Sequence, residues 1–122
     1  MERFTIPMKL PSLNEYTLAC RRNKFAGARM KKDIEQAIGL YLMKMPRYHK
    51  PIKINFTWVE STRKRDLDNI SFAKKFILDA MVKYEKILND NPRFVQGFTD
   101  TWVYGNKNEV IIEIEEVREE ND

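Results

Sequence analysis

The chain has 122 residues, which is enough for one domain with one hydrophobic core and too few for two. Hydrophobic residues make up 43% and charged residues 33%, so low-complexity disorder and collagen-like structure are excluded. No apolar run approaches the roughly 18 residues of a membrane-spanning helix, and we expect no membrane partner. The charged N-terminus is unlike a secretory signal, and the single cysteine, Cys20, excludes internal disulfides, so we expect a cytoplasmic protein.

The net charge of +4 hides an asymmetry between the two halves of the chain. Residues 1–65 contain 15 Lys and Arg against 5 Asp and Glu, whereas residues 66–122 contain 7 against 13. A basic half joined to an acidic half favours a polyanionic partner such as nucleic acid. The alternative is that the charges mix on the surface once the chain folds.

Hydrophobic periodicity predicts four strands and two helices. The strands are expected at residues 4–10, 52–59, 95–104 and 109–117, and the helices at residues 25–45 and 68–84. Pro7 favours an edge position or a bulge in the first strand, and residues 11–15 read as a turn followed by a basic stretch. Residues 105–108 are expected to close a hairpin between the last two strands.

The order β-α-β-α-β-β predicts an α+β fold, with two helices packed on one face of a small mixed sheet. We expect a single domain over residues 1–122, in which residues 116–122 form an acidic, frayed tail.

The segment Asp66-Leu67-Asp68-Asn69 joins a basic loop to the second expected helix. Two carboxylates two residues apart in an extended segment project to the same side, as the oxygen ligands of Mg²⁺ do. Asp90, in the turn after that helix, is the natural third ligand. The alternative is structural: an aspartate or Asn69 can cap the helix, and Asp90 can simply form the turn.

Helix geometry selects Lys75 among the cations of the second helix. On a regular helix Lys75 lies on nearly the same face as Asp68, and Asp79 follows it by four residues. Asp79 can therefore orient the Lys75 ammonium toward a phosphate near the acids. Lys74 is rotated off this face and is expected to be a solvated charge.

These segments, taken in order, resemble the RusA-like Holliday junction endonucleases. The resemblance is carried by Arg63-Lys64-Arg65-Asp66-Leu67-Asp68-Asn69, a helix with Lys75 and Leu78-Asp79-Ala80, and then Asn89-Asp90-Asn91. The turn Leu10-Pro11-Ser12-Leu13-Asn14-Glu15-Tyr16 is also similar to the family's proline-containing turn. The resemblance spans about residues 4–115.

The resemblance implies a homodimeric, Mg²⁺-dependent endonuclease of phages and prophages that cuts four-way DNA junctions in recombination and repair. Asp66, Asp68 and Asp90 would bind the metal and act in catalysis with a helix lysine; Mn²⁺ would also suit oxygen ligands. The family pattern has its lysine four residues after the second aspartate, where this chain has Phe72. One inserted helical turn carries the role to Lys75.

The residues expected to contact DNA are polar side chains before the second strand and around the acids. They are Asn14, Tyr16, Arg21, Arg22, Lys24, Arg29, Lys31, Lys32, Arg63, Lys64, Arg65 and Asn69. A turn and a packed ring explain Asn14 and Tyr16 nearly as well. The rival function is a non-catalytic, basic DNA-binding dimer whose acids only cap a helix and form a turn. An aspartyl phosphatase is disfavoured, because Arg63-Lys64-Arg65 replaces the hydrophobic strand end of that class.

Overall fold

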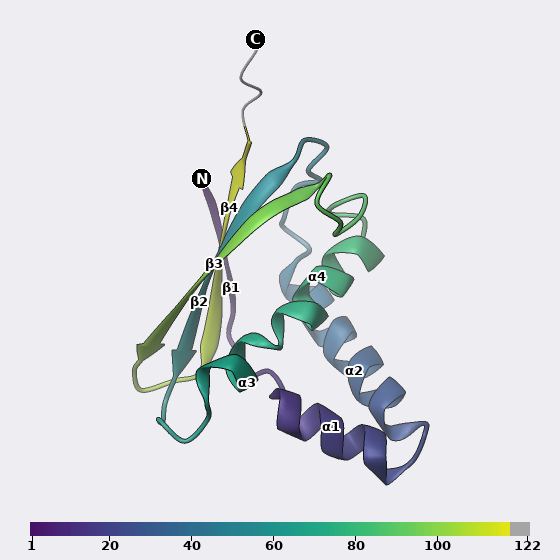
Figure 1. The fold of residues 1–122 in the computed structure, drawn as a ribbon. Coiled ribbons are helices and arrows are strands. Elements are labelled where there is room, and N and C mark those ends of the chain that lie inside the picture. The colour runs from purple at the N-terminus through teal and green to yellow at the C-terminus, as the bar shows by residue number, and fades with distance from the viewer. Residues whose placement is uncertain (118–122) are drawn as a thin grey trace.

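The computed structural model describes residues 1–117 of the chain (Figure 1). Its elements in chain order are β1 (Glu2–Ile6), α1 (Leu13–Arg22), α2 (Ala26–Tyr41), β2 (Ile52–Glu60), α3 (Leu67–Ser71), α4 (Lys74–Lys83), β3 (Val95–Tyr104) and β4 (Glu109–Glu116). Among the described residues, no helix is both long and apolar enough to cross a bilayer.

The four strands form one mixed sheet in the order β1-β4-β2-β3. Strand β4 is antiparallel to both of its neighbours, whereas β2 and β3 are parallel. The helices lie together on one face of this sheet (Figure 1). The expected α+β class and mixed sheet are therefore confirmed, as is the edge position of β1.

The core lies between the sheet and the helices. The alternation expected in β2 is confirmed, because Ile52, Ile54, Phe56 and Trp58 are all at most 2% exposed. Strand β4 adds Val110, Ile112 and Ile114, the helices add Ile38, Ile77 and Met81, and Leu42 adds to the core directly after α2. Gly39 lets α2 approach the end of α4 closely, since a Cβ there would collide with the ring of Tyr84.

The prediction that β3 and β4 form a hairpin is wrong. The two strands are consecutive in the chain, but β2 lies between them and pairs with both. Helices α3 and α4 form the crossover that makes β2 and β3 parallel. Residues 105–108 therefore lead the chain past the end of β2, and Gly105 N–H bonds to the carbonyl of Glu60.

Helix α1 occupies the segment expected to be a turn and an irregular basic stretch. Ser12 caps it, because its hydroxyl accepts a hydrogen bond from the N–H of Glu15 while the Glu15 carboxylate lies near the Ser12 N–H. This capping box begins a helix directly after Pro11. The sheet is thus covered by more helices than the two expected.

The expected helix at 68–84 is divided into α3 and α4. The N–H groups of Ala73, Lys75 and Phe76 bond to the carbonyl three residues earlier, which tightens the chain between the two helices. The straight-helix relation between Asp68 and Lys75 therefore does not hold. Elsewhere β1 ends at Ile6, before Pro7, and α2 ends at Tyr41 instead of residue 45. Of the expected tail, Glu116 ends β4, and residues 118–122 lie outside the described residues.

Candidate nuclease site

Asp66 and Asp68 are both exposed at the start of α3, on the loop that leaves β2. Asp66 occupies the N-cap position in an extended conformation, but its side chain makes no capping hydrogen bond. Among residues 1–117, the Oδ1 of Asp68 accepts a hydrogen bond only from the local N–H of Asn69, at 3.0 Å. The capping explanation therefore does not account for Asp66, whose carboxylate faces solvent.

Arg65 holds this loop in place from within the protein. Its guanidinium donates to both carboxylate oxygens of Glu60, at 2.8 and 2.9 Å, and to the carbonyl of Leu10 at 2.9 Å. The Arg65 side chain is only 13% exposed, and Glu15 lies 3.7 Å away. Arg65, expected to contact DNA, is thus committed to an internal ion pair that fixes the residue next to Asp66. Sequence reasoning missed Glu60, although a glutamate ending an apolar strand is a signal for a buried partner.

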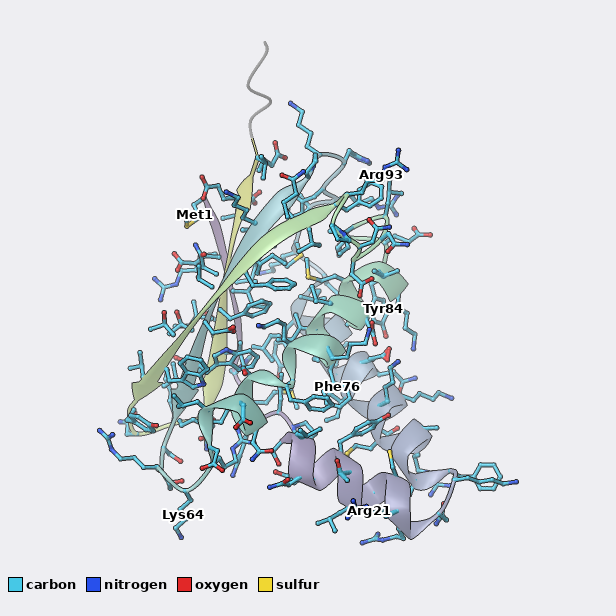
Figure 2. All side chains as sticks on the ribbon, in the orientation of Figure 1. Met1, Arg21, Lys64, Phe76, Tyr84 and Arg93 are labelled. Atoms are coloured by element: carbon cyan, nitrogen blue, oxygen red, sulfur yellow. The ribbon has the colours of Figure 1, made fainter. Side chains whose placement is uncertain are left out.

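Arg63 and Lys64 are the exposed cations of the same loop. The guanidinium of Arg63 lies 4.0 Å from the ring centroid of Tyr104, at the end of β3. Lys64 projects outward from the loop, and Arg21 projects from α1 near the same end of the molecule (Figure 2). Positive side chains therefore accompany the two exposed carboxylates.

Lys75 lies close to two of the acids named in the sequence analysis, Asp79 and Asp90. Its Nζ lies 3.1 Å from Asp79, which confirms the expected pair, and 3.8 Å from Asp90. Asp79 also contacts Lys31 of α2 at 3.0 Å. The hydrogen bond that Lys31 donates to the Asp79 carboxylate raises the pKa of Lys31. The side chain of Lys75 remains 58% exposed, so the structure leaves it accessible to a ligand.

Lys74 is not the solvated charge that the sequence suggested. Its ammonium lies 2.6 Å from Asp100 on β3, and 4.8 Å from the ring centroid of Phe98. Asp100 also accepts the indole N–H of Trp58 at 2.9 Å. The Lys74 side chain is 19% exposed, and its contacts assign it to the packing of α4 on the sheet.

The carboxylates do not form a finished metal site within one chain. In residues 1–117, no three Asp, Glu, His or Cys side chains lie close enough together to hold a metal ion. Asp66 and Asp68 lie at the start of α3, whereas Asp90 lies beyond α4 and next to Lys75. The residue types suit a hard divalent cation, but their arrangement in the single chain does not form a cage for it.

Apart from Arg63, Lys64 and Arg65, the basic residues expected to bind DNA lie on the hairpin of α1 and α2. Arg21 and Arg22 end α1, and both are exposed. A hollow of about 350 Å³ between the two helices is lined by residues that include Arg22, Arg29 and Asp33. The remaining cations of this hairpin are Lys24, Lys31 and Lys32, of which Lys31 is half-buried.

Asn14 and Tyr16 lie on the first turns of α1, and their environments differ. Asn14 is exposed, whereas the ring of Tyr16 packs against Phe72 and Phe76 at centroid distances of 5.7 and 5.5 Å. The pKa of Tyr16 is raised, mainly by a hydrogen bond with Cys20 and next by burial of the side chain. The packing of its ring therefore gives Tyr16 a structural role. Asn69, also expected to contact DNA, is half-buried beside Asp68.

Comparison with known proteins identifies a family. No curated protein matches the chain. The family model of endodeoxyribonuclease RusA matches residues 4–115, which include α1, the loop with Asp66 and Asp68, α4 and Asp90. The match covers nearly the whole chain, and we conclude that the chain belongs to the RusA endodeoxyribonuclease family.

Proposed function

We propose that this protein is a metal-dependent endonuclease that resolves four-way DNA junctions by phosphodiester hydrolysis in recombination and repair. Membership of the family supports the nuclease activity. The observation that carries the proposal to particular residues is the exposed pair Asp66 and Asp68, whose loop is fixed by Arg65 and bears Arg63 and Lys64. Carboxylates without a capping role, beside cations, suit chemistry on a phosphate backbone.

The basic side chains would act by binding DNA phosphates. Arg21, Arg22 and Arg29 on the α1–α2 hairpin would grip the arms of a junction, and Arg63 and Lys64 would hold the backbone near the acids. Lys75, oriented by Asp79, would stabilise negative charge that develops on the reacting phosphate.

The proposal includes Mg²⁺, with Mn²⁺ as an alternative, on the donor chemistry of Asp66, Asp68 and Asp90. Because these acids do not meet in one group in residues 1–117, we assign no reaction step to the cation. The proposal also includes a homodimer, since a two-fold junction is cut symmetrically by two equivalent sites. A prophage protein that acts in the cytoplasm fits this function.

The test is incubation of the protein with a labelled synthetic four-way junction, in Mg²⁺ and in EDTA, beside a linear duplex of matched sequence. We expect metal-dependent incision of the junction and none in EDTA. Asp68→Asn should abolish incision while junction binding persists. Glu115→Gln, which removes one exposed carboxylate from β4, is the matched control and should cleave normally.

A non-catalytic, basic DNA-binding dimer is the second candidate. The absence of a three-acid group in the described part of the chain favours it. It predicts junction binding without incision in Mg²⁺ or in EDTA, so the same assay separates the two. Binding alone, at every metal concentration tried, would refute the nuclease proposal.

A further inference from the structure

Strand β3 leaves one side of the sheet open for pairing. It is ten residues long and the last strand in the sheet order, and in residues 1–117 it pairs only with β2. All the helices lie on a face of the sheet, and none runs along the outer side of β3 (Figure 1). The backbone groups that point away from β2 are therefore available to another strand.

The two edges of the sheet differ in how they are protected. The opposite edge, β1, is five residues long, carries Glu2 and Arg3, and is followed by Pro7. Short length, charge and proline all hinder edge-to-edge pairing. Residues 95–104 contain no lysine, arginine or proline. The one charge in β3, Asp100, is paired with Lys74 and bonded to Trp58.

The side chains of β3 alternate between the two faces of the sheet. Phe98 contacts the buried ring of Phe56 at a centroid distance of 6.0 Å, and Asp100 contacts Trp58, so even-numbered residues face the helices. Phe98 and Tyr104 nevertheless remain 43% and 36% exposed. Thr99 and Thr101 lie on the other face and are exposed. The edge therefore offers aromatic surface on one face and threonines on the other.

We infer that β3 is the surface through which a second copy of this chain binds, by antiparallel β3–β3 pairing about a two-fold axis at Asp100. In this register Phe98 lies opposite the partner's Trp102, and Thr99 lies opposite the partner's Thr101. The numbers of two opposing residues add up to 200, so an even-numbered residue always lies opposite an even-numbered one and an odd-numbered residue opposite an odd-numbered one. Opposing side chains therefore lie on the same face of the sheet.

The sequence of β3 is complementary to itself in this register, which selects a second copy as the occupant. Aromatic pairs and Thr–Thr pairs are favourable neighbours across antiparallel strands. The register forms two of each, and it covers the exposed part of Phe98 with an aromatic ring. The two copies of Asp100 meet at the axis, but each carboxylate is already neutralised by its own Lys74. The pairing joins two four-stranded sheets into one.

This inference names the interface of the homodimer in the proposed function, and its test uses no DNA. Wild-type protein is measured by analytical ultracentrifugation over a range of concentrations. A double variant, Thr99→Lys and Thr101→Lys, places like charges opposite each other in both threonine pairs. We expect its dimer dissociation constant to be roughly 10- to 100-fold higher than that of the wild type.

A charge-swap experiment guards against misfolding. The variant with Thr99→Glu and Thr101→Glu should dimerise as weakly as the lysine variant when alone, but an equimolar mixture of the two should form a heterodimer. Circular dichroism checks that each variant is folded. Two single variants complete the comparison. Thr5→Lys, on the exposed β1 edge, should leave dimerisation unchanged, whereas Thr101→Lys should weaken it.

A monomeric wild type, dimers that persist in both charged variants, or variants that do not recover dimers on mixing would each overturn the inference. None of these results depends on cleavage. A nuclease that dimerises through another surface would retain its activity while the β3 assignment fails.

Discussion

Arg65 and Glu60 are joined by two hydrogen bonds of 2.8 and 2.9 Å, which tie the residue before Asp66 to the last residue of β2. The two partners are five positions apart in the sequence, so the pair closes the loop on itself. Both side chains are largely buried, at 13% and 6% exposure. The conformation of the loop that carries the exposed acids thus depends on a charge pair that is largely shielded from bulk water.

Replacing Arg65 with Ala should destabilise the protein by about 3 kcal/mol, because it leaves the Glu60 carboxylate buried without its partner. Arg65→Lys should recover only part of this loss, since an ammonium cannot donate both parallel bonds. Denaturant unfolding measures both changes. In the double variant Arg65→Ala, Glu60→Leu, no unpaired charge remains, and a loss as large as that of the single variant would contradict this explanation.

Asp66→Asn should separate stability from activity. The Asp66 side chain makes no capping hydrogen bond, so the free energy of unfolding should change by no more than about 0.5 kcal/mol. Under the proposed function, cleavage of a four-way junction should fall below detection. Thermal unfolding and junction cleavage, measured on the same preparation, test both parts. Because Asn caps a helix about as well as Asp, Asp66→Ala is measured beside it, and a loss of stability near about 1 kcal/mol in the alanine variant would indicate a cap that forms in solution.

Lys74 and Lys75 are adjacent but should respond differently to replacement by Met. Lys74→Met should cost about 1–3 kcal/mol of stability, because Asp100 loses a partner 2.6 Å away in a mostly buried setting. Lys75 is 58% exposed, so Lys75→Met should change stability by about 0.5 kcal/mol or less. Only Lys75→Met should lower the cleavage rate of folded protein, by about 100-fold. Equal cleavage rates in the two variants would remove Lys75 from the proposed site.

Local sequence patterns predicted the strands well because β2 and β4 alternate cleanly between a buried and a solvent-facing side. They failed on strand order, since Gly105-Asn106-Lys107-Asn108 is typical turn sequence whether or not the flanking strands pair with each other. That β2 lies between β3 and β4 depends on long-range contacts absent from any short window.

Helix α1 was missed although the sequence carries its signal. Ser12 followed three residues later by Glu15 is a capping-box pattern, but Pro11 and Asn14 favoured a turn. The break after Ser71 has no comparable signal, because Phe72 and Ala73 are compatible with a continuous helix. The Lys75–Asp79 contact was predictable from its spacing of four residues. The contacts of Asp79 with Lys31, and of Arg65 with Glu60, require the tertiary fold.

The basic hairpin should make DNA binding strongly dependent on salt. Arg21 and Arg29 are exposed, and each phosphate contact contributes about 0.9 to the slope of log affinity against log salt concentration. Arg21→Ala and Arg29→Ala should each reduce that slope by about one, without changing the preference among sequences. Junction binding measured at several salt concentrations gives the slope. Arg3→Ala, which removes a cation from β1, should leave it unchanged.

The stability of the fold should decrease in alkaline solution because of Tyr48. Its hydroxyl donates a 2.8 Å hydrogen bond to Glu2, and burial, with that bond, raises the pKa of Tyr48 well above its usual value. The unfolded chain therefore loses this proton near pH 10 while the folded chain retains it. Stability is fully present below pH 10 and falls above it, by up to about 1.4 kcal/mol per pH unit. In Tyr48→Phe this decline should be shallower, because the chain releases one proton fewer on unfolding. Unfolding free energies measured between pH 9 and 11 would show the difference. An unchanged slope in Tyr48→Phe would mean that Tyr48 ionises equally in both states.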